Sequence, residues 1–268
     1  MLELIQITND PPFAQRCDAL GGFRLFVDLE RNGKAERQAG RNTFISTHQV
    51  EDVGRVKRAL RQSRLMVRVN PLHAGTAAEV DAVLAQGADL LMLPMFTGAQ
   101  QLRDFSALVA GRKPIVPLLE TAGALRSLDE WADTPGLHEI FVGLNDLHLS
   151  LGHRFMFQAL ADGTVERVAR AAQARGLRFG FGGIARLEEG LLPGRDVLAE
   201  HLRLGSGAVI LSRTFHRDDP DAVFEHEVAA LRAVEAGLAQ RTPAQVQADA
   251  RRIADAITGI AAGLAARA

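Results

Sequence analysis

Two acidic side chains follow two successive apolar runs of the sequence, and both are placed where chemistry could occur. Glu120 closes the run Pro114–Glu120, and Asp146 lies shortly after the run Glu139–Val142. Such runs are typical of strands buried in a parallel sheet. Gly143, between the second run and Asp146, lets the backbone turn or lets another group approach closely. Carboxylates without histidine or cysteine neighbours suit Mg²⁺ or Mn²⁺, so we predict a divalent metal on Glu120 and Asp146.

Further polar residues lie at the predicted carboxyl ends of neighbouring strands. Asp28 and Glu30 end the second strand, Arg68 lies on the third, and Asn145 precedes Asp146. Taken singly, each could be a structural ion-pair partner or a helix-terminal acid. Together at one end of a parallel sheet they favour a functional interpretation. A metal there could polarise the ketone of a chelating 2-oxo acid and stabilise its enolate, with Arg68 adding positive charge.

The scarcity of lysine bears on the mechanism. Of the 31 lysine and arginine residues, only Lys34, Lys57 and Lys113 are lysines. An aldolase that forms a Schiff base needs a lysine inside the barrel. Lys113 begins a strand and Lys57 falls on a surface helix, which leaves Lys34 in a loop. The pattern therefore disfavours an imine mechanism and favours activation of the carbonyl by a metal.

Eight apolar runs alternate with amphipathic, helix-like segments along the chain. The predicted strands are Leu2–Thr8, Phe23–Glu30, Leu65–Asn70, Leu90–Met95, Pro114–Thr121, Glu139–Asp146, Arg178–Ala185 and Ala208–Phe215. Strict alternation predicts an α/β fold, a single (β/α)8 TIM barrel over residues 1–241. The alternative is an open doubly wound sheet, but no Gly-x-Gly-x-x-Gly motif follows the first strand, which argues against its dinucleotide-binding form.

Two segments fall outside a minimal barrel. Arg31–Ile45 is a polar loop that is longer than most strand-to-helix connections. Residues 242–268 form a predicted extra C-terminal helix with apolar positions Val246, Ile253, Ile257 and Ile260. Because the barrel is already complete, we expect this helix to pack on a neighbouring subunit or to cross to it, which predicts a homo-oligomer.

Composition limits the partners. The chain has 268 residues, 47% of them hydrophobic, and a net charge of −1, so we expect neither a nucleic-acid nor a membrane partner. The first residues lack the basic and apolar regions of a signal peptide. The single cysteine, Cys17, cannot form an internal disulfide, which fits a cytoplasmic protein.

Several short motifs resemble one known family in order and spacing. They are Asp28–Glu30, Val67–Asn70, Leu91–Met95, Leu118–Thr121 and Gly143–Leu147. Together they resemble the HpcH/HpaI aldolase and citrate lyase β-subunit family over roughly residues 25 to 152. The resemblance implies a barrel of the phosphoenolpyruvate/pyruvate type, a divalent metal on Glu120 and Asp146, and Arg68 in contact with substrate. It also implies carbon–carbon bond cleavage or formation, and a C-terminal helix exchanged between subunits.

The chain departs from that family at two positions. Pyruvate aldolases of the family carry histidine, and citrate-lyase-like members aspartate, where this chain has Arg31. The aldolases also have glutamine where this chain has Leu118. The proton path and the orientation of the substrate are therefore open, with His48 and His148 as unplaced substitutes for the histidine.

The ends of the last two predicted strands carry glycine and small polar residues. Phe181–Ala185, at the end of the seventh predicted strand, contains two glycines, and Ser212 and Arg213 lie at the end of the eighth. Such backbone binds phosphate in many barrels, although a tight turn would also need the glycines. A phosphorylated or CoA-linked substrate follows from the first interpretation.

We therefore predict a divalent-metal-dependent carbon–carbon lyase, a class II-type aldolase acting on an aldol adduct of pyruvate or a related 2-oxo acid. The alternatives are a citrate-lyase-like or malyl-CoA-type lyase acting on a CoA thioester, and a non-catalytic barrel that binds a small acid. Arg68, Asp28 and Glu30 are assigned catalytic roles. The predicted substrate-binding residues are Gly143, Asn145, Leu118, Ser212 and Arg213.

Overall fold

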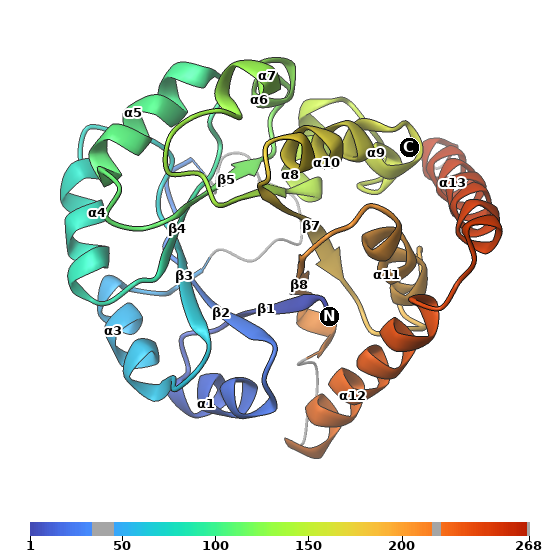
Figure 1. Cartoon of the computed structure of the whole chain (residues 1–268), viewed down its shortest axis with the longest axis horizontal. Helices are drawn as coiled ribbons and strands as arrows, with labels where there is room; N and C mark the ends of the chain where they lie inside the picture. Colours follow the sequence, from blue (N-terminus) through green and yellow to red (C-terminus); the bar gives the residue numbers. More distant parts are fainter. Residues whose placement is uncertain (34–45, 216–220, 267–268) are drawn as a thin grey trace.

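Eight parallel strands close into a barrel in the computed structural model of the chain, which describes residues 1–33, 46–215 and 221–266. Each strand pairs with its sequence neighbours, and β1 pairs with β8 (Figure 1). The strands are β1 (Glu3–Ile7), β2 (Phe23–Asp28), β3 (Arg64–Arg68), β4 (Leu90–Leu93), β5 (Ile115–Leu119), β6 (Glu139–Val142), β7 (Arg178–Ile184) and β8 (Ala208–Leu211). The predicted (β/α)8 barrel with a C-terminal helix is confirmed.

All eight predicted strands form, but each ends one or more residues earlier than the sequence predicted. The prediction was wrong about β6, because Asn145 and Asp146 lie in the first turn of helix α8 (Leu144–Ser150) rather than on the strand. Gly143 is the residue that precedes this helix. The chain therefore leaves β6 as a helical turn directly above the barrel, which changes the element that presents Asp146.

Helices surround the barrel in the order expected. They are α1 (Pro11–Leu20), α3 (Val50–Ala59), α4 (Thr76–Ala85), α5 (Ala99–Val109), α6 (Ala122–Arg126), α7 (Leu128–Trp131), α9 (Gln158–Ala161), α10 (Thr164–Ala174), α11 (Gly194–Arg203), α12 (Asp221–Leu238) and α13 (Pro243–Ala265), with a 3-10 turn at Arg213–Phe215. Helices α8 and α9 lie in a stretch that was not predicted to be helical. The predicted loop 31–45 is described only for its first three residues.

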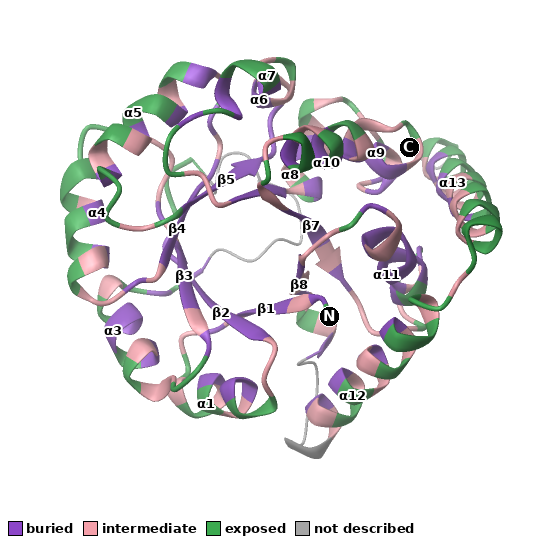
Figure 2. Ribbon diagram, viewed as in Figure 1, coloured by how far each residue is buried: buried purple, intermediate pink, exposed green. Residues whose placement is uncertain are grey.

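Two apolar layers hold the barrel together. The inner layer fills the barrel with side chains such as Phe26, Met66, Met92 and Phe141. The outer, larger layer lies between the strands and the helices, where purple buried faces of the helices point inward and green faces point outward (Figure 2). Burial of both faces of each strand explains why the apolar runs are continuous in sequence.

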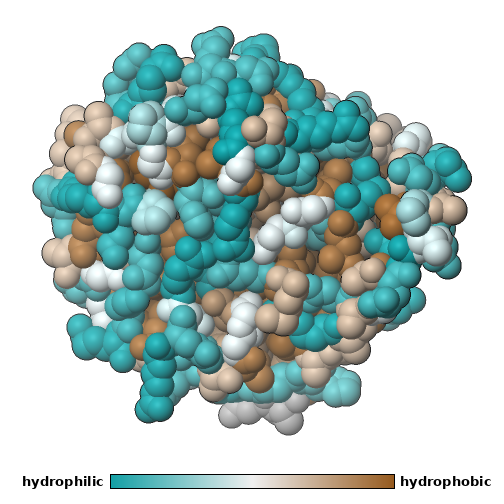
Figure 3. All heavy atoms as spheres, viewed as in Figure 1, coloured by the Kyte–Doolittle hydropathy of each residue, from teal (hydrophilic) through white to brown (hydrophobic). Residues whose placement is uncertain are grey.

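Helix α13 packs against α9 and α11 of its own chain, burying Ile253, Ile257 and Ala261. It stands at the edge of the barrel, beyond α9 and α11 (Figure 1). Exchange of this helix between subunits remains a prediction. Hydrophilic side chains cover much of the outer ring in the space-filling view (Figure 3). Among the described residues, no helix has the length and apolarity to cross a bilayer.

Candidate metal and substrate site

A cavity of about 990 Å³ opens at the carboxyl end of the strands. Nine of the ten predicted site residues line it: Asp28, Arg68, Leu118, Glu120, Gly143, Asn145, Asp146, Ser212 and Arg213. Glu30, the remaining one, is not among the lining residues and is buried beside Arg68. The rule that catalytic residues gather at this end of a barrel therefore located the cavity correctly.

Glu120 is a carboxylate buried next to the cavity, with only 2% of its surface exposed. Its Oε1 accepts a hydrogen bond of 2.9 Å from the backbone N–H of Met95. Met95 has a φ of 55°, a left-handed conformation that is uncommon for a residue other than glycine. The strained turn after β4 thus aims a backbone donor at Glu120, a kind of strain often found at functional sites.

The charge on Glu120 is disfavoured by its protein surroundings. Burial raises the pKa of Glu120 to about 8. The charge of Arg68 acts in the opposite direction, whereas Glu30 and Asp146 raise the pKa further. A bound cation would reverse this effect, because it would favour the ionised form of the carboxylate.

Gly143 makes room for Glu120. A Cβ atom at position 143 would lie 2.8 Å from Oε2 and 3.0 Å from Cβ of Glu120, closer than side chains approach. The φ of Gly143 is −85°, so backbone strain does not require glycine here. The expected close approach is therefore confirmed, and the approaching group is the carboxylate of Glu120.

Helix α8 presents the second predicted metal ligand. Asp146 lies in its first turn, half-buried, and lines the cavity together with the exposed Asn145. An acid in a first helical turn is also stabilised by the backbone N–H groups there. The helix end and a cation could both use this carboxylate, since each of its oxygens can accept separately.

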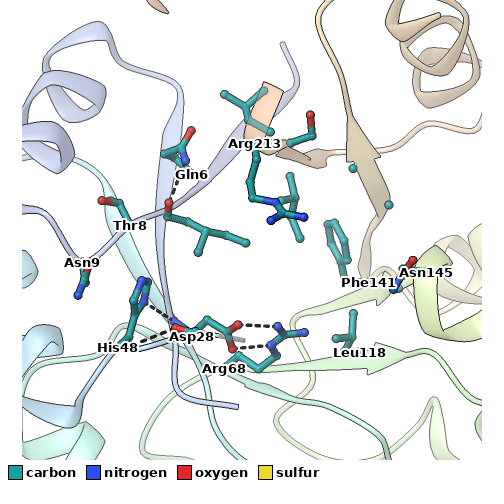
Figure 4. Close-up of a pocket in the computed structure, with 18 of the residues that line it drawn as sticks. Gln6, Thr8, Asn9, Asp28, His48, Arg68, Leu118, Phe141, Asn145 and Arg213 are labelled. Carbon is teal, nitrogen blue, oxygen red and sulfur yellow. Dashed lines mark hydrogen bonds and ion pairs between the residues drawn. The ribbon is translucent and has the colours of Figure 1, made fainter. Parts of the chain in front are cut away.

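Arg68 is held between two carboxylates. Its Nε donates to Oδ1 of Asp28 at 2.8 Å and its Nη2 to Oδ2 at 2.7 Å, which is a bidentate pair (Figure 4). Glu30 Oε2 lies 3.3 Å from the same Nη2. Burial opposes the charge of Arg68, but Asp28 and Glu30 outweigh it and raise the pKa of Arg68. Arg68 is therefore a fixed positive charge at the wall of the cavity.

The donor set fits a hard divalent cation. Glu120 and Asp146 form no ion pair with a described lysine or arginine within 4 Å. In the part of the chain that the structure describes, no three histidine, cysteine, aspartate or glutamate side chains gather as a metal cluster. Two carboxylates would leave several coordination positions to water and substrate, which is how Mg²⁺ is usually held.

The end of β8 forms the opposite part of the rim. Ser212 Oγ lies 2.8 Å from Thr214 Oγ1, and Figure 4 shows the guanidinium of Arg213 pointing into the cavity. Gly182 and Gly183 of β7 also line the cavity, where the pairing register of β7 with β8 shifts. At Gly182 a Cβ would lie 2.7 Å from Leu144 Cδ1. Packing against α8 therefore accounts for Gly182 without a phosphate.

Three further groups were missed by the sequence analysis. Gln6, Thr8 and Asn9 line the cavity from the end of β1. The strand-end rule would have found them had it been applied to the first strand. His48 also lines the cavity, whereas His148 is not among the lining residues, and its Nδ1 lies 3.2 Å from the carbonyl oxygen of Leu144 in its own helix.

The two lysines that the structure describes lie away from the cavity, as the sequence predicts. Lys57 on α3 pairs with Asp89 at 2.6 Å, and Lys113, before β5, lies 3.9 Å from the same carboxylate. Neither lines the cavity. Lys34 lies outside the described residues.

Comparison with known proteins gives one family for the chain. The model of the HpcH/HpaI aldolase/citrate lyase family matches residues 9–185. No curated protein matches the chain.

Solved structures of the same fold share little sequence identity with the chain. An HpcH/HpaI aldolase/citrate lyase family protein from Burkholderia cenocepacia has 17% identity and a TM-score of 0.63, over 88% of this chain and 95% of that one. An HpcH/HpaI aldolase from Desulfitobacterium hafniense has 16% identity and a TM-score of 0.60, over 87% and 93%. The citrate lyase β subunit from Mycobacterium tuberculosis, complexed with oxaloacetate and magnesium, has 17% identity and a TM-score of 0.58, over 90% and 97%.

Proposed function

This chain belongs to the HpcH/HpaI aldolase/citrate lyase family, and we propose that it is a divalent-metal-dependent carbon–carbon lyase of the aldolase type. Its substrate would be an aldol adduct of pyruvate or of a related 2-oxo acid. The observation that carries the proposal is the pair Glu120 and Asp146, which line one cavity and form no ion pair with a described basic residue.

Glu120 and Asp146 would hold Mg²⁺ or Mn²⁺ in this proposal. The ion would polarise the 2-oxo group and stabilise the negative charge that develops when the neighbouring carbon–carbon bond breaks. A structure of a related protein, the citrate lyase β subunit from M. tuberculosis, contains magnesium together with oxaloacetate, a 2-oxo acid. This supports the same assignment for the residues of this chain.

The chain's own residues orient the substrate. Arg68, fixed by Asp28 and Glu30, presents a permanent positive charge to a carboxylate or to a developing oxyanion. Leu118 and Phe141 form an apolar floor that excludes water from one side. Gly143 and Asn145 line the cavity next to Asp146, where they would contact the same end of the substrate.

A CoA thioester is the second candidate substrate, because the cavity is larger than pyruvate requires. Its volume of about 990 Å³ is at the upper end of the range for pockets that hold drug-sized ligands. Ser212 and Arg213 at the rim could contact a phosphate of such a substrate. The two candidate functions can be distinguished by asking which compound, pyruvate or acetyl-CoA, exchanges its protons with the solvent.

Proton exchange tests the proposal directly. With Mg²⁺ or Mn²⁺ in deuterated water, the protein should exchange the methyl protons of pyruvate, as followed by NMR. Exchange into acetyl-CoA instead would support the thioester lyase. Pyruvate binding without any exchange would contradict both and indicate a non-catalytic acid-binding barrel.

Metal binding provides the matched test of the ligands. Glu120→Gln and Asp146→Asn should each lower Mn²⁺ affinity in calorimetry by at least about tenfold. Asp81→Asn is the control, because Asp81 is an exposed carboxylate on α4 that pairs with Arg112. Unchanged affinity in the Glu120 and Asp146 variants would mean that the metal binds elsewhere.

A further inference from the structure

Gln6 is a buried amide near the carboxyl end of β1, beside the cavity. Only 2% of its surface is exposed, yet it lines the cavity. Its Nε2 donates a hydrogen bond of 2.9 Å to the carbonyl oxygen of Ile7 (Figure 4). Its Oε1 is buried and has no hydrogen-bond partner among the residues that the structure describes. Buried acceptors are nearly always paired in native proteins, so this oxygen indicates that a bound group completes it.

The bond to Ile7 determines which end of the amide carries the oxygen. With the amide turned over, Oε1 would face the carbonyl oxygen of Ile7, and two acceptors would meet without a proton. The unsatisfied atom of Gln6 is therefore an acceptor. A group that completes it must donate, as a hydroxyl or an N–H does, whereas a carboxylate or a ketone cannot. Because Oε1 is shielded from bulk water, we expect a ligand to supply this donor with a small shift of the amide.

The residues that follow β1 also present acceptors to the cavity. Asn9 lines it, and its Nδ2 donates to Oδ2 of Asp52 at 2.9 Å, so its amide oxygen is directed away from that carboxylate. Asp10 lines it as an exposed carboxylate, which can only accept. The backbone N–H of Asp10 donates to Thr8 Oγ1 at 3.0 Å, which fixes the turn ahead of α1. The β1 wall, formed by Gln6, Asn9 and Asp10, therefore favours a ligand rich in donors.

The β1 wall lies away from the predicted metal ligands. Figure 4 shows Gln6 on the opposite side of the cavity from Leu118 and Asn145. Leu118 lies two residues before Glu120, and Asn145 directly precedes Asp146. With the 2-oxo acid half of the substrate at the metal, the part that reaches Gln6 is the acceptor half, which becomes the free aldehyde on cleavage.

We propose that Gln6 is a specificity-determining residue, whose Oε1 accepts a hydrogen bond from a hydroxyl group on the acceptor half of the substrate. This hydroxyl lies beyond the carbon that becomes the aldehyde, so it keeps its proton throughout the reaction. Asn9 and Asp10 offer acceptors to further hydroxyls. The inference rests on the proposed function, because the opposite wall would bind the 2-oxo acid half. The site therefore selects hydroxylated aldehydes over alkyl aldehydes and over aldehydes that carry a carboxylate.

Three aldehydes test this selection in the direction of bond formation. Native protein with Mn²⁺ and pyruvate is given glyceraldehyde, propanal or succinic semialdehyde, and kcat/KM is measured for each. Propanal has the carbon chain of glyceraldehyde without its hydroxyls, and succinic semialdehyde ends in a carboxylate. We expect kcat/KM for glyceraldehyde to exceed that for propanal by at least about tenfold, because propanal leaves Oε1 unpaired. Succinic semialdehyde should be no better than propanal.

A substitution assigns the selection to Gln6. Gln6→Leu removes the acceptor and keeps a side chain of similar size, so glyceraldehyde should lose about tenfold in kcat/KM while propanal changes by less than about twofold. Gln100→Leu is the control, because Gln100 is exposed on α5, pairs with Asp104 and is not among the residues that line the cavity. It should keep the native values. Urea midpoints check the folding of Gln6→Leu, which we expect to be retained because leucine leaves no unpaired polar atom there.

Other outcomes overturn the assignment. A native ratio near one, as when a buried water completes Oε1, would contradict selection by hydroxyl groups, and this comparison does not depend on the folding of a variant. A preference for succinic semialdehyde, or equal losses for glyceraldehyde and propanal in Gln6→Leu, would also contradict it. In each case, exchange of the pyruvate protons would leave the proposed function intact. If the pyruvate protons do not exchange with either metal, the proposed function fails, and this inference fails with it.

Discussion

Each end of the barrel holds a buried arginine between two carboxylates, but the two ends differ in what surrounds that arrangement. At the amino end, Arg24 contacts Glu3 and Glu139 and is fully buried. At the carboxyl end, Arg68 contacts Asp28 and Glu30. The local motif is therefore the same, and the difference lies in the remaining charges.

The amino end has more arginines than carboxylates. Glu3 also contacts Arg178 at 2.9 Å and Arg64 at 3.7 Å, while Glu139 Oε2 lies 2.6 Å from Nη1 of Arg24. The pKa of Glu3 is lowered, because Arg24, Arg178 and Arg64 together outweigh the opposing effect of burial. Every carboxylate in this group has an arginine partner, which is the pattern of a structural network.

The carboxyl end differs, among the described residues, in holding two carboxylates, Glu120 and Asp146, that form no ion pair with lysine or arginine. Glu120 and Asp146 are added to Asp28 and Glu30, and burial raises the pKa of Glu120 instead of lowering it. A buried carboxylate such as Glu120, with no ion-pair partner among the described residues, is unfavourable for folding, and such a group is retained where a cation or a substrate completes it. The comparison teaches that unbalanced charge distinguishes a site from a structural ion-pair network.

The largest effect is expected at the amino end. Arg24→Met leaves Glu139 buried without a partner and should lower the free energy of unfolding by about 3–5 kcal/mol, measured by urea denaturation. Arg64→Met removes a half-exposed partner of the same network and should change it by less than about 1 kcal/mol. Similar losses of unfolding free energy in the two variants would show that the burial of Arg24 does not determine its contribution to stability.

The same substitution at the two ends should act in opposite directions. In metal-free protein near neutral pH, Glu120→Gln should raise the free energy of unfolding by about 1–3 kcal/mol, since it removes a carboxylate that must take up a proton when the chain folds. Glu139→Gln should lower it by about 2–3 kcal/mol, because it deprives Arg24 of one of its two carboxylate partners and leaves only Glu3. Urea denaturation with a chelator present measures both. Destabilisation by both substitutions would contradict the comparison.

A smaller effect is expected from filling the space that Gly143 leaves beside Glu120. In Gly143→Ala the new methyl group pushes Glu120 from its position, so Mn²⁺ affinity in calorimetry should fall about tenfold. Gly237→Ala, in helix α12 with nothing within 4 Å of the added Cβ, should leave the affinity unchanged. Equal affinities in all three proteins would show that Glu120 tolerates displacement.

The smallest effect is expected in the acid limb of the stability of metal-free protein. Asp18 accepts backbone hydrogen bonds from Arg61 and Ser63, ahead of β3. Burial opposes its charge, but these bonds outweigh burial and lower its pKa below 3.8. Its contribution is therefore present above that pH and is lost as the pH falls further. Asp18→Asn should flatten the acid limb of stability by about 1 kcal/mol.

Glu120 should give the opposite slope. Its pKa rises from 4.5 to about 8 on folding, so the metal-free protein loses stability as the pH rises between these values. Mg²⁺ should remove this loss, and Glu120→Gln should abolish it. Urea midpoints across the range measure the slope. A slope that persists in Glu120→Gln would assign it to another group.

Much of the architecture could be predicted from the sequence. The eight apolar runs, such as Leu90–Leu93, became the eight strands because a strand buried on both faces needs continuous apolar residues. The strand-end rule then placed residues as distant as Asp28 and Arg213 around one cavity. The short helices α8 and α9 escaped prediction, because a helix of seven residues or fewer has too little apolar periodicity to detect.

The sequence by itself determined the barrel, the end at which the polar residues gather and the carboxylate chemistry of Glu120 and Asp146, because each depends on local patterns and residue chemistry. Only the tertiary structure decided that Arg68 pairs with Asp28, that Gly143 makes room for Glu120, and that His48 meets the backbone of Asp28. These contacts join residues far apart in sequence across closed strands and loops. Distance, orientation and charge balance between such residues exist only once the barrel has closed.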